Sequence, residues 1–429
     1  MRTMAQPEAV ADWLRARVRG ELQCDSRRLH AGDGFVAWPG AATDGRRFVR
    51  DALRAGAGAA VVERDGLEAF ELDDPRVLAV PGLKAHAGAL ASAFCHEPST
   101  ALDVIAITGT NGKTSSAWWM AQLLSACARP AAVVGTLGMG RPGSELVPTG
   151  LTTPDPVMLQ HQLRAFVDQG LRACAIEASS IGIVEGRLNG TRIKVAVFTN
   201  FTQDHLDFHG SMDAYWKAKA RLFDWPGLQT VVINLDDPRG DALLQRVTVH
   251  GLEVWTVGID RPARLSAHGI ETTPTGMAFG LVERDLQGRE ATRARLDLPL
   301  VGRYNVHNLL GVLAAARALD VPLGQAVAAL GLAGSGWHAG AATPSALNPE
   351  DRLYDGPALV KASAGCDGIM CAAGDALNGE TIAALPASIR IISTFSVGYE
   401  HVDVAAATNR NIVVSNTPDV LTDATADIT

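Results

Sequence analysis

The chain has 429 residues, of which 47% are hydrophobic and 20% charged, and its formal net charge is −8. This composition is typical of globular proteins, and the net negative charge removes any electrostatic reason to expect nucleic acid or an anionic membrane as a partner. No run approaches the ~20 apolar residues of a membrane span, and the N-terminus lacks the apolar core of a signal peptide. We therefore expect a cytoplasmic protein, without membrane insertion, that acts on small molecules.

The six cysteines are scattered through the chain without a C-x-x-C pair or a nearby set of histidines. This pattern suits a reducing compartment and favours buried thiols over a structural zinc site.

The first 81 residues alternate short apolar runs with helix-like stretches. The runs lie at residues 34–38, 59–63 and 77–80. This alternation predicts a small α/β domain, which we place at residues 1–86.

The next apolar run, residues 104–107, ends in the sequence T-G-T-N-G-K-T and precedes a helix-like segment. Gly109 and Gly112 permit a tight loop whose N–H groups face a polyphosphate, and the following helix N-terminus adds partial positive charge. Lys113 would reach the terminal phosphates and Thr114 would hold Mg²⁺. The loop lacks the first glycine of the Walker pattern, where Ile107 stands, yet strand, loop and helix together predict an ATP site.

Further strands are expected at residues 131–134, 173–176, 195–199 and 230–234, separated by helix-length segments. This order predicts a mostly parallel P-loop-type sheet with helices on both faces, in a central domain of residues 87–333. Residues 265–298 suggest an antiparallel appendage, and residues 305–319 and 323–330 are predicted helices.

Two polar clusters follow strands of this sheet. Glu177 ends the strand in A-I-E-A-S-S, where a carboxylate facing the phosphate loop would contact Mg²⁺. A serine nucleophile at Ser179 or Ser180 is less expected, because G-x-S-x-G is absent. The second cluster, T-N-F-T-Q-D-H-L-D-F-H-G, is followed by a helix that carries Lys217 and Lys219. Its density of acidic and histidine side chains after an apolar strand indicates a site.

These motifs occur in the order seen in the Mur ligases, together with L-T-T-P-D-P, N-L-D-D-P and L-V-G-R-Y-N-V-H-N-L-L. The resemblance covers about residues 1–333 and is strongest to the type that adds the third amino acid to UDP-N-acetylmuramoyl-L-alanyl-D-glutamate. It implies an ATP-dependent amide ligase of peptidoglycan precursor synthesis, with an acyl phosphate intermediate. The implied ligands are ATP, Mg²⁺, the UDP-N-acetylmuramoyl dipeptide and an amino acid.

The resemblance also implies residue roles. Catalysis and metal binding fall on Lys113, Thr114, Glu177, His205 and Lys219, where Lys219 matches the carbamylated lysine of the family. The ATP-binding positions are Gly109, Thr110, Asn111, Gly112, Lys113, Thr114, Ser115, Asn305 and Asn308. The positions along the UDP-sugar peptide are Ser26, Arg46, Thr152, Thr153, Ser179 and Arg187. Two residues of that pocket depart from the family pattern: Ile181 replaces a common His and Glu185 a common Gln.

The resemblance ends after Leu332, where the third ligase domain and its D-N-P-R loop are not found. We predict a linker at residues 334–346. Residues 347–429 resemble the N-terminal, substrate-side part of D-2-hydroxyacid dehydrogenases, which implies a partial flavodoxin-like α/β segment. S-T-F-S-V-G-Y-E-H-V-D carries this resemblance, and Val397 and Gly398 match backbone that contacts the substrate carboxylate. G-S-G-W-H-A at Gly334 fits a dinucleotide pattern but follows a helix, so an NAD site is not expected there.

The sequence therefore suggests a chimera: an impaired ligase joined to part of a dehydrogenase, through a frameshift, a misassembled gene or a fusion. Two other functions stay open. One is an ATP- or UDP-sugar-binding protein without turnover, and the other, less favoured, is a D-2-hydroxyacid dehydrogenase.

Overall fold

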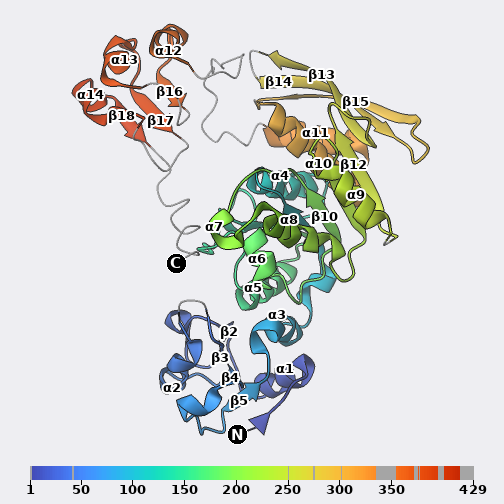
Figure 1. The fold of residues 1–429 in the computed structure, drawn as a ribbon, viewed down its shortest axis with the longest axis vertical. Coiled ribbons are helices and arrows are strands. Elements are labelled where there is room, and N and C mark those ends of the chain that lie inside the picture. The colour runs from blue at the N-terminus through green and yellow to red at the C-terminus, as the bar shows by residue number, and fades with distance from the viewer. Residues whose placement is uncertain are drawn as a thin grey trace. The chain divides into compact units, whose positions relative to one another are not determined.

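The computed structural model describes residues 2–40, 43–249, 251–273, 276–300, 302–334, 354–371, 375, 377–394 and 401–415 (Figure 1). By internal contacts the chain divides into two units. One comprises Met1–Ser266, Val282–Ala294 and His307–Ala333, and the other Ala267–Leu281, Arg295–Val306 and Gly334–Thr429. The predicted domain boundaries stay a prediction, and the one at residue 86 falls inside a helix, α3.

The N-terminal region forms a five-stranded sheet in the order β1-β5-β4-β3-β2, with every neighbouring pair parallel. Its strands are β1 (Arg2–Thr3), β2 (Leu22–Gln23), β3 (Gly34–Ala37), β4 (Ala59–Glu63) and β5 (Val77–Val80). Its helices are α1 (Pro7–Arg15), α2 (Val49–Arg54) and α3 (Leu83–Phe94). The three predicted apolar runs are therefore confirmed as strands.

Alternation along β4 explains why this sheet is buried on both faces. Val61 packs with residues of α1 and α3, whereas Ala60 and Val62 pack with residues of α2 on the opposite face. Successive strand residues point to opposite faces, so a continuous apolar run needs helices on both sides.

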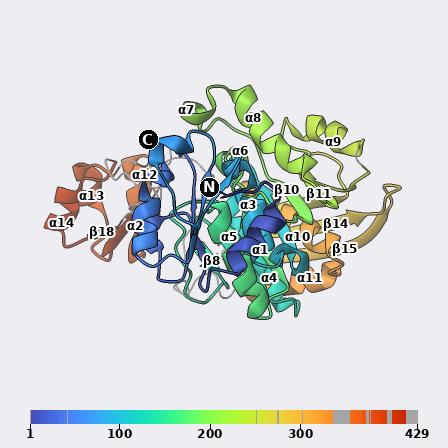
Figure 2. The same ribbon diagram turned by 90° about the horizontal axis from the view of Figure 1, so that it is seen from below.

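The central sheet has ten strands in the order β15-β14-β13-β12-β11-β10-β6-β9-β7-β8. Strands β10, β14 and β15 of this sheet are labelled in Figures 1 and 2. The strands from β12 to β7 in this order run parallel, as predicted, and β8 is antiparallel to β7. The strands of this sheet are β6 (Asp103–Thr108), β7 (Ala131–Gly135), β8 (Gly138–Gly140), β9 (Ala173–Glu177), β10 (Val195–Phe198), β11 (Thr230–Asn234), β12 (Glu253–Gly258), β13 (Leu265–Thr273), β14 (Gly276–Arg284) and β15 (Glu290–Leu298).

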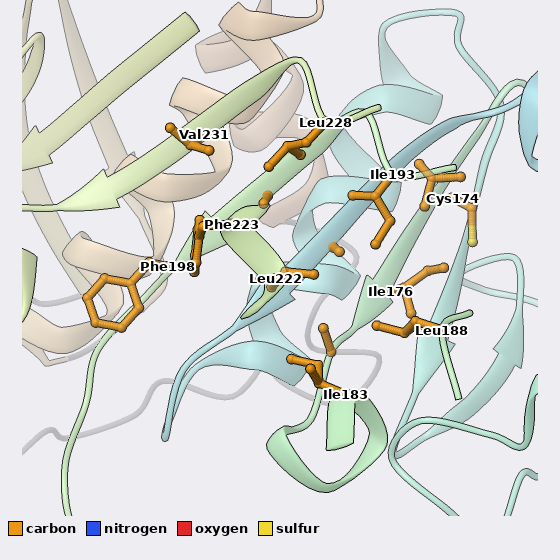
Figure 3. Close-up of a cluster of buried hydrophobic side chains, with 14 of the residues drawn as sticks. Cys174, Ile176, Ile183, Leu188, Ile193, Phe198, Leu222, Phe223, Leu228 and Val231 are labelled. Atoms are coloured by element: carbon orange, nitrogen blue, oxygen red, sulfur yellow. The ribbon is translucent and has the colours of Figure 1, made fainter. Parts of the chain in front are cut away.

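The helices that follow these strands are α4 (Lys113–Ala126), α5 (Pro156–Asp168), α6 (Ser180–Val184), α7 (Leu206–His209), α8 (Met212–Ala220), α9 (Gly240–Thr248), α10 (Arg303–Ala318) and α11 (Leu323–Gly334). A large apolar cluster unites the strands with α5, α6, α8 and α9, and Figure 3 draws part of it, including Ile176, Ile183 and Phe198. The predicted antiparallel appendage is supported at one end, where the Arg284 N–H donates to Arg264 O, so that β14 ends beside the start of β13. Residues 274 and 275, between β13 and β14, lie outside the described residues.

The C-terminal region forms a three-stranded parallel sheet in the order β16-β17-β18. It consists of β16 (Gly368–Cys371), β17 (Ile391–Thr394), β18 (Val413–Ser415), α12 (Gly356–Ala362), α13 (Gly379–Ala384) and α14 (Val404–Asn409). Cys371 and Ile392 lie in its core, whereas Met370, Ile391 and Val413 are 80%, 43% and 61% exposed. The alternation of strands and helices matches the prediction. The linker after Gly334, Val397 and Gly398 lie outside the described residues.

Among the described residues, no helix is long and apolar enough to cross a membrane.

Candidate active site

The phosphate loop (residues 109–112) joins the end of β6 to the start of α4. Gly109 and Gly112 have φ angles of +155° and +83°, a region that side chains other than glycine rarely adopt. A Cβ on Gly109 would lie 1.9 Å from Thr199 Oγ1, and one on Gly112 would lie 2.2 Å from Asn308 Oδ1. Both glycines are therefore required by backbone conformation and by close packing.

Lys113 begins α4 and folds back over the phosphate loop. Its Nζ donates to Gly109 O at 3.0 Å and to Thr110 O at 2.8 Å. Burial lowers the pKa of this amine, and the nearby carboxylates of Glu177 and Asp204 oppose that shift. Carbonyl groups thus hold Lys113 at the loop. An anionic phosphate is a stronger hydrogen-bond partner for an ammonium group than a carbonyl, so it would replace them.

Glu177 is the last residue of β9 and is 1% exposed. Its carboxylate accepts from Thr114 Oγ1 at 2.7 Å and from Thr136 N at 2.9 Å, and Thr136 Oγ1 lies 3.3 Å away. Burial raises the pKa of Glu177, and these hydrogen bonds counteract the shift. Glu177 and Thr114, which were both predicted to hold Mg²⁺, are in direct contact. Thr136 is a partner of Glu177 that was not predicted.

The end of β10 supports the loop from the other side. Asn200 Oδ1 accepts from Asn111 N at 2.9 Å, and Asn200 Nδ2 donates to Asn111 O at 3.0 Å. Thr199 Oγ1 donates to the same Asn111 oxygen at 2.7 Å. Both residues belong to the T-N-F-T motif of the predicted cluster, but the motif alone predicted no role for them. The contact follows from the parallel pairing of β10 with β6, which makes their carboxyl ends neighbours and which the sequence pattern does not specify.

His205 lies just before α7 with a φ of +47°. Its Nε2 lies 3.4 Å from Asp204 Oδ2, and its ring meets the Tyr215 ring edge to face at 6.0 Å. Burial lowers the pKa of His205, and Asp204 opposes this shift. A neutral imidazole is the form that binds metal ions.

Lys219, in the last turn of α8, is 1% exposed. Its Nζ donates to Gly109 O at 2.8 Å and lies 4.5 Å from the centre of the Tyr215 ring. Burial lowers its pKa well below the ordinary value, and Lys113 adds to this shift. The structure thus brings Lys219 to the same loop as Lys113.

Residues predicted along the UDP-sugar peptide lie partly beside this site. Thr153 Oγ1 donates to Glu177 O at 2.7 Å and lies 3.0 Å from Ser179 Oγ, while Arg187 donates to Thr153 O at 3.2 Å. Thr152 Oγ1 accepts from Thr136 Oγ1 at 3.1 Å. These four residues therefore adjoin Glu177 through direct or single-residue contacts.

Ser26 and Arg46 belong to the N-terminal sheet region instead. Arg46 is 6% exposed and forms a salt bridge with Asp44 at 2.7 Å, and its guanidinium also donates to Glu63 O and Asp65 O. The Arg46 guanidinium is therefore bonded to residues of the N-terminal sheet region. Its predicted substrate role stays a prediction, as does that of Ser26.

The remaining predicted residues lie on α4 and α10. Ser115 is half-buried in the first turn of α4, and the Asn308 side chain packs against Gly112. Asn305 belongs to the other unit, where its N–H donates to Gly302 O at 3.0 Å.

The loop offers a fit for a polyphosphate and a divalent cation. The two glycines leave a path without Cβ atoms, a 14-residue helix begins at the loop, and Lys113 supplies positive charge. The Thr114 hydroxyl and the Glu177 carboxylate are oxygen donors of the kind that Mg²⁺ prefers. Among the described residues, no group of three or more His, Cys, Asp or Glu side chains could hold a metal, so the predicted set depends on Thr114 and on modification of Lys219.

Comparison with known families agrees with this arrangement. The Mur ligase middle domain matches residues 107–316, and the Mur ligase family catalytic domain matches residues 21–94. The catalytic domain of D-isomer specific 2-hydroxyacid dehydrogenases matches residues 351–429. The C-terminal resemblance is thus found, while dehydrogenase activity is not tested by it.

Two curated relatives are UDP-N-acetylmuramoyl-L-alanyl-D-glutamate--2,6-diaminopimelate ligases. That of Acidovorax sp. (strain JS42) is 52% identical over 336 residues, covering 77% of this chain and 66% of the relative. That of Janthinobacterium sp. (strain Marseille) is 44% identical over 335 residues, covering 75% and 65%. The chain therefore spans just under two thirds of the length of these relatives.

A solved structure of a UDP-N-acetylmuramoyl-L-alanyl-D-glutamate--2,6-diaminopimelate ligase superposes with a TM-score of 0.64 and 26% identity, covering 93% of this chain and 84% of that one. This likeness, the two matching domains and the identity to the curated relatives make the chain a member of the Mur ligase family.

Proposed function

We propose that this chain is an ATP-dependent amide ligase that adds the third amino acid to UDP-N-acetylmuramoyl-L-alanyl-D-glutamate. The observation that carries the proposal is that Lys113 and Lys219 both contact the phosphate loop, while the helix that follows the loop carries the Thr114–Glu177 pair. The names of the curated relatives support the choice of substrate. Substrates of this kind, ATP and a UDP-linked sugar, imply work in the cytoplasm.

The reaction divides into two steps. An oxygen of the glutamate side-chain carboxylate attacks the γ-phosphorus of ATP, and the bond to ADP breaks. The amine of the incoming amino acid then attacks the acyl carbon, phosphate leaves, and the nitrogen loses a proton as the amide forms. Negative charge gathers at the γ-phosphate in the first step, so stabilisation by fixed positive groups is the main task of the site.

The chain's own residues suit that task. Lys113 would exchange its bonds to two loop carbonyls for bonds to the phosphate oxygens. Thr114 and Glu177 would hold one Mg²⁺, and His205 with a carbamylated Lys219 would hold a second. Bound Mg²⁺ neutralises charge between the phosphate and the carboxylate. Thr153, Ser179 and Arg187 adjoin Glu177 and would hold the peptide of the UDP-sugar.

The amine of Lys219 is suited to carbamylation by CO₂. Only an unprotonated amine attacks CO₂, and burial lowers the pKa of this lysine well below its ordinary value. The nitrogen of the neutral amine bonds to the carbon of CO₂ and loses a proton, which leaves an anionic carbamate. An unmodified ammonium at this position would repel Mg²⁺.

The test is ADP release by the purified chain with ATP, Mg²⁺ and UDP-N-acetylmuramoyl-L-alanyl-D-glutamate, with and without meso-diaminopimelate or L-lysine. Release that requires both the UDP-sugar peptide and an amine supports the ligase. The Lys113→Ala chain serves as the background control. Absence of amine-dependent release under all conditions would overturn the proposed activity.

A second candidate is a protein that binds ATP and the UDP-sugar without turnover. The observation in its favour is that the aligned region leaves about a third of each curated relative unmatched. ATP binding by equilibrium titration, without product from any amine, would favour this candidate.

A further inference from the structure

Tyr215, on α8, is a fully buried side chain at the centre of the site, and sequence analysis gave it no role. Its hydroxyl oxygen lies 3.3 Å from Thr110 Oγ1 in the phosphate loop. The face of its ring lies 4.5 Å from Lys219 Nζ. One side chain thus contacts both the loop and the buried lysine.

The hydrogen positions at Thr110 follow from its partners. Thr110 Oγ1 donates its single proton to Thr202 O at 3.1 Å and accepts from Thr202 N at 2.9 Å. A hydroxyl has one proton and two lone pairs, so only an acceptor site remains for Tyr215. A tyrosine phenol ordinarily has a pKa of about 10, so it keeps its proton at neutral pH. Tyr215 therefore donates to Thr110.

Two residues of α8, one helical turn apart, hold two consecutive residues of the loop. Tyr215 contacts Thr110, and Lys219 donates to Gly109 O. Positions i and i+4 lie on the same face of a helix, which explains why one helix holds both loop residues. The α8 helix and the elements around it are labelled in Figure 1.

Other ring side chains also pack against Tyr215. The His209 ring packs against it with centroids 5.1 Å apart, and His209 Nε2 lies 2.9 Å from Ser180 Oγ at the start of α6. The Phe201 ring lies 5.0 Å away. The ring is thus fixed on several sides and has little freedom to move away from the loop.

From these contacts we propose that Tyr215 is a positioning residue, whose hydroxyl fixes the phosphate loop and whose ring orients Lys219 toward it. The proposal rests on the proposed function insofar as the loop binds ATP. It predicts that the hydroxyl and the ring act separately: the hydroxyl through Thr110, and the ring through Lys219.

The first test compares Tyr215→Phe with the unaltered chain by titration of Mg·ATP and by hydrogen exchange without nucleotide. Loss of one hydrogen bond of this length should weaken ATP binding roughly threefold to tenfold. The amides of Thr110, Asn111 and Thr202 should exchange faster, and those of the N-terminal sheet should not change. Equal affinity and equal exchange would overturn the proposal while leaving the proposed function intact.

If the unaltered chain binds no ATP, the proposed function fails, and hydrogen exchange alone decides the role of Tyr215. A double-mutant cycle with Thr110→Ala gives an independent check. In that background Tyr215→Phe should have no further effect on exchange or affinity, because the acceptor is already gone. Independent, additive effects would contradict the proposed pairing.

The ring is tested with Tyr215→Leu, and Phe223→Leu is its packing control. Phe223 is equally buried but belongs to the large apolar cluster, where it packs edge to face with Phe198. Both changes should lower stability, but only Tyr215→Leu should alter the bicarbonate dependence of turnover or of the carbamate signal in ¹³C NMR. An identical response from both variants would reduce Tyr215 to a packing residue and overturn the proposal.

Discussion

Lys113 and Lys219 both donate to the same atom, the carbonyl oxygen of Gly109, at 3.0 and 2.8 Å. Two ammonium groups this close repel each other, and Lys219 is buried while Lys113 is half-buried. The pKa of each lysine is lowered by burial, that of Lys219 further by Lys113. The repulsion between the two lysines would fall when Lys113 binds a phosphate or when Lys219 becomes a carbamate. Both predicted changes therefore reduce the same repulsion.

Lys113→Ala should abolish measurable Mg·ATP turnover, with a loss of at least ~100-fold, because the site loses its cation for the phosphates. The matched control is Lys217→Ala, since Lys217 is a 73% exposed lysine of α8 paired with Asp213. ADP release measures both. Turnover that survives Lys113→Ala unchanged would refute the ATP site.

Glu177→Gln should lower turnover by about 100-fold, because a neutral amide is a poor ligand for Mg²⁺. The fold should survive, since the amide retains an acceptor for Thr136 N. Because burial raises the pKa of Glu177 in the folded chain, the protonated carboxyl contributes to folding stability at acid pH. This contribution is lost as the pH rises through the raised pKa of the folded chain. In urea unfolding at neutral pH, the Gln variant should therefore have a higher free energy of unfolding than the unaltered chain. This gain should be absent below pH 4.5, the ordinary pKa of a glutamate side chain. A variant less stable at neutral pH contradicts this.

Lys219→Met should flatten the pH dependence of stability on the alkaline side, provided bicarbonate is excluded. A lysine with a lowered folded-state pKa binds fewer protons when folded, so stability rises with pH between that pKa and the ordinary value of 10.5. Replacing the amine with an apolar side chain removes this contribution. Unfolding curves from pH 7 upward check the prediction, with Lys217→Met as control. Parallel pH profiles for the Lys219 variant and the unaltered chain would exclude a buried, perturbed amine.

Gly112→Ala should damage the site more than Gly143→Ala. Both glycines have similar positive φ angles, +83° and +87°, so both substitutions carry the same backbone strain. A Cβ at residue 112 would lie 2.2 Å from Asn308 Oδ1, whereas nothing lies within 4 Å of one at residue 143. We expect about 1 kcal/mol loss of stability at residue 143 and more at residue 112, together with loss of ATP binding there. Equal losses in thermal unfolding and ATP titration would show that strain alone matters.

The sequence predicted the parts of the site that depend on local motifs. The phosphate loop, its strand and helix, and Glu177 at the end of β9 follow from short patterns of glycine, lysine and apolar residues. The strands at residues 131–134, 173–176 and 230–234 were also predicted, because buried parallel strands are continuous apolar runs. Strand β12, Glu253–Gly258, was missed because its polar residues interrupt that pattern.

Contacts between distant segments could not be predicted in the same way. Asn200 and Tyr215 meet the loop, and Thr136 meets Glu177, only because the order β10-β6-β9-β7 brings their segments beside β6. Arg46 was expected at the substrate on resemblance alone, and its buried bond to Asp44 became visible only in the fold. Single residues without a motif of their own depend on strand order, which periodicity does not specify.

The one-turn spacing of Tyr215 and Lys219 makes the length of α8 as important as its composition. An α-helix turns by about 100° per residue, so one inserted residue between them would swing Lys219 off the face that meets the loop. Every side chain would still be present, and the helix would still form. Such a chain would contain all the functional residues, but Tyr215 and Lys219 would no longer both face the phosphate loop.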